Sequence, residues 1–453
     1  MCWTRIAIRL VVLVGSLALV GRASAEGPQI YEQRWSDKAL NERIDSNIEK
    51  YRKGALKIEV VDAAGKAVPN ATVEVKQTGH EFLFGCNAFV LGQLKTPEAN
   101  RTYEEEFARL FNFTTVPLYW AGTEPTQGEL RYAEGGRDIW RRPPADRYLA
   151  FAKKYGITLK GHPLVWFAHN PDWLPQDPEK LRELFRKRMR EIAERYADKM
   201  PIWDVVNESI VCEKKFPLYT PDKAYVAWSF REAAPLFPAS ATLMINEVNL
   251  SNYGTPATNK YYAQVKQLLA DKVPVRGVGF QFHFMRRGEL DTHLTNADGD
   301  PTRLYDLYDE FGKFGLPLFI TEITIPSAGP DGEALQDEVV RNYYRLWFSV
   351  PAMRGITWWN LGDGTAVQGE NEAEGGLVDG ELKPKAAYHT LDKLINEEWK
   401  TKATVRTDAA GRAEARGFFG KYAVKVVAGG KEQTVEVDHA SQGETVHRVT
   451  LAE

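Results

Sequence analysis

Eight short runs rich in branched and aromatic residues recur along most of this 453-residue chain, with amphipathic helical stretches between them. Strand–helix alternation of this kind builds a parallel sheet, and eight units are the number that closes a barrel. We therefore expect an α/β fold with a (β/α)8 barrel over residues 81–400. A doubly wound open sheet is the alternative, but that fold usually carries a glycine-rich phosphate turn, which this sequence lacks. The predicted strands are Phe82–Val90, Thr114–Trp120, Ile157–Trp166, Ile202–Asn207, Thr242–Val248, Val275–His283, Leu316–Ile325 and Arg354–Leu361.

The first 25 residues have the order of a cleavable secretion signal. Arg5 and Arg9 precede the apolar run Leu10–Val20, and the small residues Ala23–Ala25 follow it. The apolar run is too short to cross a bilayer comfortably. We therefore expect residues 1–25 to be removed as a signal peptide, which would leave a secreted or periplasmic protein.

The two flanks of the barrel resemble each other. Both Ile58–Val75 and Thr404–Val427 contain two strand-like runs separated by the sequence DAAG. A single hairpin is marginally stable, so we expect residues 56–80 and 401–453 to combine into one small β-sandwich-like satellite. A structural role for it is favoured over carbohydrate binding, because it offers few aromatic side chains. Residues 26–55 are predicted to form a charged helical lead-in.

Composition excludes several kinds of partner and cofactor. The net charge is −3, and no basic run is interleaved with aromatic residues, so we expect no nucleic-acid partner. We also expect no membrane contact after signal cleavage, and a monomer. Once Cys2 leaves with the signal, Cys86 and Cys212 remain, as two buried thiols by preference or as a single disulfide. No CxxC or HExxH spacing occurs, so no metal or other cofactor is expected.

Two glutamates stand where predicted strands end. Glu208 directly follows the fourth apolar run, and Glu322 lies near the end of the seventh. The C-terminal ends of barrel strands line the active face, and two carboxylates across a pocket are the groups that cleave a glycosidic bond. On spacing alone, one of the two acids remains open to a purely structural role. Other polar and aromatic residues at these strand ends are His162, Trp166, Asn207, Gln281, His283 and Trp359.

Five motifs at these strand ends occur in the order of a known family. They are GHPLVW, WDVVNES, GVGFQFH, LFITEI and GITWW. Together they resemble glycoside hydrolase family 10, the endo-β-1,4-xylanases, over about Phe82 to Tyr388. The resemblance implies that Glu208 is the general acid/base and Glu322 the nucleophile of a retaining mechanism.

The same resemblance implies roles for the residues around the two glutamates. Asn207 would bind the 2-hydroxyl of the reacting sugar, and His283 would hydrogen-bond the nucleophile, with Gln281 beside it. His162 and Trp166 would line the glycone side. Trp359 would stack beneath the reacting sugar, and we expect it, rather than Trp358, to face the pocket because neighbours on a strand point to opposite sides.

The sequence departs from the family pattern beside the reacting sugar. Val116 and Tyr119 stand where the family has an asparagine and a lysine that grip the next sugar, and Phe167 and His169 replace a histidine and a glutamine. The loop Gly362–Gly376 replaces a second family tryptophan. We expect Tyr119 to contact substrate instead. Xylan is the expected substrate; a decorated xylan or another β-glycan is the alternative, as is an inactive carbohydrate-binding barrel.

Overall fold

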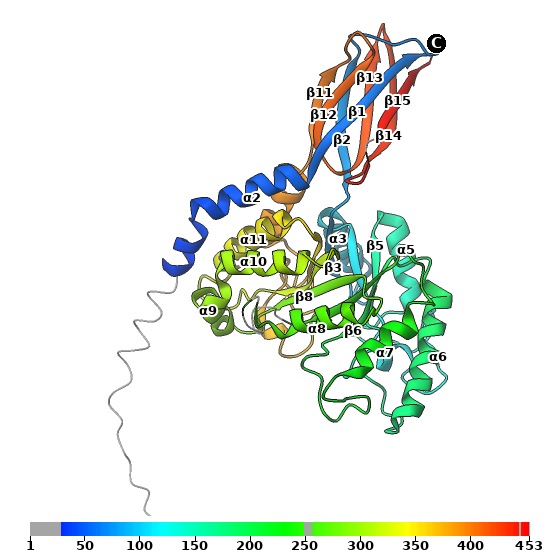
Figure 1. Cartoon of the computed structure of the whole chain (residues 1–453), viewed down its shortest axis with the longest axis vertical. Coiled ribbons are helices and arrows are strands. Elements are labelled where there is room, and N and C mark those ends of the chain that lie inside the picture. The colour runs from blue at the N-terminus through cyan, green and yellow to red at the C-terminus, as the bar shows by residue number, and fades with distance from the viewer. Residues whose placement is uncertain (1–28, 249–254, 256, 444, 453) are drawn as a thin grey trace, which may run out of the picture.

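The computed structural model describes residues 29–248, 255, 257–443 and 445–452. The predicted signal peptide at residues 1–25 lies outside the described residues. Two bodies are visible in Figure 1: a large body of helices and strands, and a narrow body of strands that stands on one end of it.

The large body is a closed barrel of eight parallel strands, which confirms the predicted fold class. The strands are hydrogen-bonded in the order β10-β3-β4-β5-β6-β7-β8-β9, and β10 pairs with β3 to close the ring. Every predicted strand is present, with ends that differ by a few residues. The bounds are β3 Leu83–Asn87, β4 Phe113–Pro117, β5 Thr158–His162, β6 Ile202–Asn207, β7 Thr242–Glu247, β8 Gly277–His283, β9 Leu318–Thr324 and β10 Met353–Trp358.

Amphipathic helices cover the outside of the barrel. In α6 (Pro178–Tyr196), the predicted apolar face is buried, and Asp177 caps the first turn by accepting a hydrogen bond from the Lys180 backbone. Pro178 opens this helix, where its missing N–H costs little. The other helices are α3 Pro97–Leu110, α4 Trp120–Thr123, α5 Ala145–Tyr155, α7 Ala224–Ala233, α8 Lys260–Ala270, α9 Arg287–Thr295, α10 Pro301–Gly312, α11 Gly332–Ser349 and α12 Ala386–Lys393.

The barrel interior is filled with side chains near the N-terminal ends of its strands. Phe113, Ile202, Met244 and Phe319 form a separate buried cluster contributed by β4, β6, β7 and β9. Strand β9 is a neighbour of none of the other three, so these side chains meet inside the ring. The interior is therefore a solid core beneath the rim, as is usual for this fold.

The narrow body is a two-sheet sandwich built from both flanks, as predicted. One sheet has the order β12-β1-β15 and the other β11-β2-β13-β14, so each N-terminal strand lies between C-terminal strands. Strand β1 begins at Lys53, within the predicted lead-in, which therefore ends earlier than residue 55. The strands are β1 Lys53–Asp62, β2 Thr72–His80, β11 Lys402–Arg406, β12 Arg412–Phe418, β13 Gly420–Ala428, β14 Lys431–His439 and β15 Val446–Leu451.

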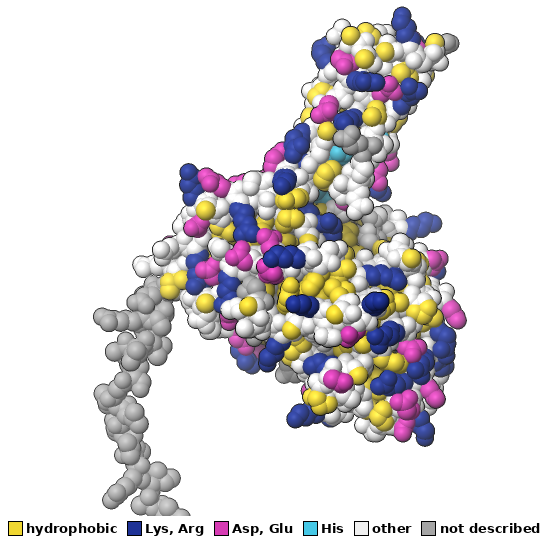
Figure 2. Space-filling model, in the orientation of Figure 1, with side chains coloured by type: hydrophobic (Ala, Val, Ile, Leu, Met, Phe, Trp, Pro, Cys, Tyr) yellow, Lys and Arg dark blue, Asp and Glu magenta, His cyan; other side chains and the backbone are white. Residues whose placement is uncertain are grey.

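The sandwich lies at the end of the barrel where the strands begin. Strand β2 ends at His80 and the chain enters β3 at Leu83, so the sandwich is opposite the C-terminal strand ends. Helix α2 (Lys38–Tyr51) packs on α11 beside this junction (Figure 1). Charged side chains of both signs are interspersed over the two bodies (Figure 2).

The structure also describes both cysteines that follow the predicted signal peptide. Cys86 and Cys212 are both free and buried, so the preferred expectation of two buried thiols is confirmed. In the part of the chain that the structure describes, no helix is long and apolar enough to span a membrane.

One barrel position admits only glycine. A Cβ atom on Gly161 of β5 would lie 2.3 Å from the ring of Trp203 on β6. Trp203 is fully buried, and its Nε1 donates to the Met200 carbonyl oxygen at 2.6 Å, so the ring has no room to move. The close approach of these two strands therefore depends on the absence of a side chain at residue 161.

We expect Gly161→Ala to lower the free energy of unfolding by about 1–3 kcal/mol, because the added methyl overpacks the core. Thermal unfolding at a constant scan rate measures the effect. Gly288→Ala is the matched control, since a Cβ there meets nothing within 4 Å. Equal unfolding temperatures for the two variants would contradict this account.

Candidate active site

Strand β6 delivers Glu208 to the rim through an unusual backbone conformation. Glu208 has a φ of 56°, in the left-handed region that non-glycine residues rarely occupy, and its N–H donates to the Asn246 carbonyl oxygen at 2.8 Å. Such a conformation costs about 1–3 kcal/mol and occurs preferentially at functional sites. The turn leaves Glu208 half-buried at the rim, directly after the buried Asn207.

A single side-chain amide joins the two glutamates. Gln281, near the end of β8, donates from Nε2 to Glu208 Oε1 at 3.0 Å and to Glu322 Oε1 at 3.2 Å. The two carboxylates therefore face each other across one amide group, although Glu322 lies in β9 and Glu208 directly follows β6. The three residues were expected at one rim from the sequence, and they lie together there.

Glu322 is held as an anion. It accepts hydrogen bonds from Asn246 Nδ2 at 2.9 Å and from His283 Nε2 at 3.1 Å. Thr324 orients the histidine from the other side, since its Oγ1 lies 2.9 Å from Nδ1 of His283. Burial raises the pKa of Glu322, but the hydrogen bond from His283 and the charges of nearby histidines and Lys160 outweigh it, so this pKa lies below its usual value.

Glu208 has the opposite electrostatic environment. Burial raises the pKa of Glu208, and the negative charge of Glu322 raises it further. Gln281 and Trp166, whose Nε1 donates to Oε2 at 3.1 Å, oppose that shift without cancelling it. The site therefore contains one carboxyl group that favours the protonated form and one that favours the ionised form.

A buried charged group lies beneath the rim. Asp204 Oδ2 accepts hydrogen bonds from Lys160 Nζ at 2.8 Å and from His162 Nδ1 at 2.6 Å, and all three side chains are almost completely buried. Burial raises the pKa of Asp204, but the charge of Lys160 and the hydrogen bond from His162 hold it below its usual value. The carboxylate thereby sets the orientation of the His162 ring.

Aromatic residues form one wall of the site. Trp359 contacts His162, His283 and Phe89 edge-to-face, with centroids 5.9, 5.8 and 5.0 Å away. Tyr119 meets Phe89 at 5.8 Å and lies 5.6 Å from the ring of Trp166. Trp358, by contrast, is fully buried in the main core. Trp359 is thus the member of the pair that belongs to the site.

The residues that depart from the family pattern occupy different places. Val116 is completely buried in the main core, whereas Tyr119 belongs to the aromatic wall and carries the Arg142 guanidinium 4.0 Å above its ring. Phe167 is half-buried beside Trp166, and His169 lies 5.2 Å from Tyr119. An aromatic and cationic surface therefore takes the place of the family's polar pair.

The loop Gly362–Gly376 is anchored to this wall. Arg141 donates from Nη1 to Asn360 Oδ1 at 2.6 Å and to the Thr365 carbonyl oxygen. Asn360 in turn donates from Nδ2 to Glu370 Oε2 at 3.0 Å. The loop is therefore held beside Trp359 by buried hydrogen bonds.

Sequence reasoning missed two supporting residues at the end of β7. Asn246 donates to both Asn207 Oδ1, at 2.8 Å, and Glu322. Glu247 is fully buried and accepts from Ser209 Oγ at 2.7 Å and from the Ile210 N–H at 2.8 Å, and burial raises the pKa of Glu247 to about 7. The available signal was the dipeptide Asn-Glu, which occurs at the C-terminal end of both strands: Asn207 ends β6 and Glu208 follows it, and Asn246 and Glu247 end β7.

Comparison with known proteins gives several similar chains. The "Anti-sigma-I factor RsgI6" of Acetivibrio thermocellus is 28% identical over 403 residues, which are 88% of this chain and 47% of the relative. "Endo-1,4-beta-xylanase 5" of Arabidopsis thaliana is 27% identical over 391 residues, covering 83% of this chain and 61% of the relative. This chain thus spans about half to three-fifths of the length of these relatives.

The fold has solved counterparts. One is the crystal structure of xylanase 10B from Thermotoga petrophila RKU-1 in complex with xylobiose. Its superposition on this chain has a TM-score of 0.57 and 22% sequence identity, and the aligned part covers 70% of this chain and 95% of the xylanase chain. The family described as "Glycosyl hydrolase family 10" matches residues 78–394, which is more than half of the chain and contains the whole barrel. The chain therefore belongs to glycosyl hydrolase family 10.

Proposed function

We propose that this protein is a secreted endo-glycosidase that hydrolyses β-1,4-xylosidic bonds in xylan with retention of anomeric configuration. The observation that supports the proposal most is the pair of glutamates bridged by Gln281, whose pKa values are shifted in opposite directions. Secretion is proposed from the N-terminal sequence alone.

The spacing of the two carboxylates favours retention over inversion. Because both Oε1 atoms accept from one nitrogen, they cannot lie farther apart than the sum of 3.0 and 3.2 Å. Inverting enzymes need about 6.5–9.5 Å between carboxyl groups to admit a water molecule, whereas retaining enzymes use about 5–5.5 Å. The bridge by Gln281 is compatible with the shorter separation.

The two acids would act in sequence. In the first step, Glu208 gives its proton to the leaving glycosidic oxygen while a Glu322 oxygen bonds to the anomeric carbon. The ester that forms removes the negative charge of Glu322, and this lowers the pKa of Glu208. In the second step, Glu208 accepts a proton from water, whose oxygen attacks the anomeric carbon and releases Glu322 as a carboxylate.

The surrounding residues would bind the sugars. Asn207, held by Asn246, is proposed to bind the 2-hydroxyl of the reacting sugar, and His283 to keep Glu322 ionised. Trp359 offers its ring to that sugar, and Trp166, His162 and Tyr119 line the neighbouring position.

The names of several relatives support xylan as the substrate. "Endo-1,4-beta-xylanase 5" and the "Endo-1,4-beta-xylanase B" of Thermotoga neapolitana, which is 27% identical over 326 residues, are both named as xylanases. Tyr119, which stands at one of the family's polar positions and lies beneath the Arg142 guanidinium, favours a decorated xylan or another β-glycan as the second candidate. An inactive binding barrel is disfavoured, because such a protein has no use for two carboxyl groups with opposite pKa shifts.

We expect Glu322→Ala to lower the rate of reducing-sugar release by at least about a thousandfold, because no other group can form the glycosyl ester. The assay uses a panel of xylans and β-glucans. The control is Glu183→Ala, which removes an exposed glutamate of α6. Release from another glycan alone would change the substrate and keep the mechanism, whereas no release by the unmodified protein would make it a binder.

We expect Glu208→Gln to slow the departure of the leaving group. Hydrolysis of xylan should fall by about 10²–10⁴-fold, because a sugar alkoxide needs a proton to depart. Formation of the glycosyl ester from an aryl xyloside with an acidic phenol should fall far less, since a phenolate leaves unaided. Burst kinetics on the aryl xyloside separates the two steps. A loss of equal size on both substrates would argue against Glu208 as the acid.

The pH dependence follows from the two pKa shifts. Glu322 must be ionised and its pKa is lowered, so the acid limb of kcat/KM should lie below 4.5, the usual glutamate value. Glu208 must be protonated and its pKa is raised, so the basic limb should lie above 4.5. Glu322→Gln should lower the pKa of Glu208 in a carbon-13 NMR titration, because it removes a neighbouring negative charge. An unchanged pKa would refute the proposed coupling.

A further inference from the structure

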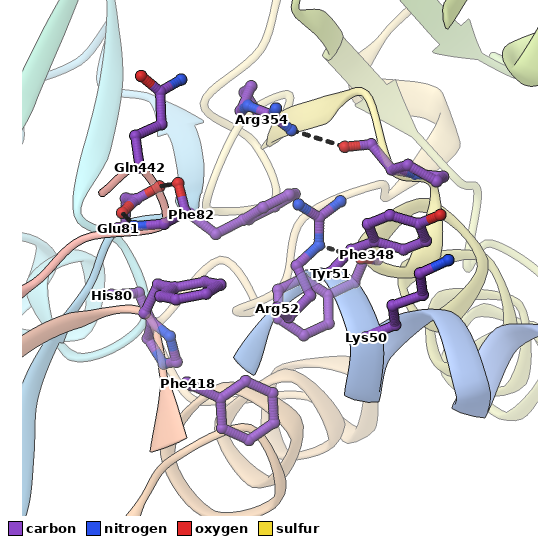
Figure 3. A pocket seen from close by; sticks show the side chains of 13 residues that line it. Lys50, Tyr51, Arg52, His80, Glu81, Phe82, Phe348, Arg354, Phe418 and Gln442 are labelled. Carbon is purple, nitrogen blue, oxygen red and sulfur yellow. Dashed lines mark hydrogen bonds between the residues drawn. The ribbon is translucent and has the colours of Figure 1, made fainter. Parts of the chain in front are cut away.

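A cavity of about 260 Å³ lies at the junction of the sandwich and the barrel, opposite the catalytic rim. Figure 3 shows its lining, with Arg52 near the centre, between the rings of Phe82 and Phe348, and Arg354 on the side of the barrel. Glu81 and the sandwich residue Phe418 complete the enclosure. Both bodies of the molecule therefore contribute to one cavity.

The lining carries an excess of positive charge. Three cations, Lys50, Arg52 and Arg354, face a single carboxylate, that of Glu81. Glu81 is engaged on the sandwich side, where its carboxylate accepts from the Ser441 N–H at 2.7 Å and from the Ser441 hydroxyl. Within the described part of the chain, no ion pair joins Arg52 or Arg354 to a carboxylate. Burial lowers the pKa of both guanidinium groups, and the charge of Glu81, which they share, offsets this only in part.

Arg52 is committed to this position by the barrel. Its side chain is 7% exposed, and it donates from Nε to the Phe348 carbonyl oxygen and from Nη2 to the Val350 carbonyl oxygen, both at 2.5 Å. Among the described residues, no hydrogen-bond partner is found for its Nη1. Burial, and then the charge of Arg354, lower the pKa of Arg52 to about 9, so the group is still a cation at neutral pH.

The aromatic rings around the cavity already carry cations. The Arg52 guanidinium lies 4.9 Å from the centroid of Phe82 and 5.4 Å from that of Phe348, and Lys53 lies 4.6 Å from Phe418. Each of these contacts takes up one face of its ring and so leaves less ring surface for a sugar to stack on. The guanidinium groups are thus the chemical feature left to recognise a ligand, and guanidinium pairs best with carboxylate and phosphate oxygens.

We propose that the junction cavity is a binding site for a small oxyanion, held by Arg52 and Arg354. The cavity is smaller than the pockets of about 300–1,000 Å³ that take drug-sized ligands, which limits the occupant to a few atoms beyond the anionic group. Two sources share the required chemistry, namely inorganic phosphate and the carboxylate of a single sugar acid. Either would join the C-terminal end of α2, which carries Arg52, to barrel strand β10, which carries Arg354, so binding would stabilise the folded molecule.

The test is calorimetric titration of the full chain with sodium phosphate, sodium glucuronate and glucose, at an ionic strength held constant with sodium chloride. Thermal unfolding under the same conditions is the second readout. We expect saturable binding and a higher unfolding temperature with phosphate, glucuronate or both, and neither effect with glucose. Binding of phosphate alone identifies the free anion as the source, and tighter binding of glucuronate identifies the sugar acid.

Arg354→Gln is the informative variant, because Arg354 lies at the barrel surface and donates to the Pro351 and Met353 carbonyl oxygens. We expect it to weaken anion binding at least tenfold. Arg276→Gln is its matched control, since Arg276 also bonds two backbone carbonyl groups, those of Pro238 and Ala241, at a distance from the cavity. The control should bind like the unmodified chain.

Two results would overturn the proposal. One is the absence of binding by either anion to the unmodified chain, a measurement that requires no variant to fold. The other is equal binding by Arg354→Gln and Arg276→Gln, which would place the anion elsewhere. Xylan hydrolysis is irrelevant to both readouts, so the proposal stands or fails apart from the catalytic assignment.

Discussion

The hydrogen bonds that join β10 to β3 close the barrel, and the rest of the molecule depends on that closure. Only in a closed ring do the ends of β6, β8 and β9 face one another closely enough for Gln281 to reach both glutamates. Closure in turn requires close-packed strands. Gly161 permits such packing against Trp203, and the interior cluster around Phe113 and Met244 fills the space beneath the rim.

The two glutamates have the same chemistry and acquire different acidities from their surroundings. Glu322 accepts hydrogen bonds from three side chains, those of Asn246, Gln281 and His283, and these bonds stabilise its negative charge. Burial raises the pKa of Glu208, and the neighbouring charge of Glu322 raises it further, so Glu208 favours the neutral form. One fold thus produces an acid and a base from identical side chains, by placement alone.

Periodicity predicted the barrel well, because each strand is a short apolar run and each helix an amphipathic one, and these patterns are local. The rim residues were predicted for the same reason, since strand ends are readable in a sequence. The group Lys160–Asp204–His162 was not, because its members are interior polar residues that meet only across neighbouring strands. The same limit explains why the bonds from Arg141 to the loop after β10 were not predicted.

The sandwich also has a consequence for the order of folding. Strands β1 and β2 are made first, but their partners β11 to β15 come only after the whole barrel has been synthesised. In the folded molecule the Gln77 N–H donates to the Thr401 carbonyl oxygen at 2.9 Å, so the barrel brings the two flanks together. An unfolded barrel would leave them far apart, at a large cost in loop-closure entropy. During synthesis on the ribosome, the first two strands must therefore wait unpaired, and the sandwich assembles last.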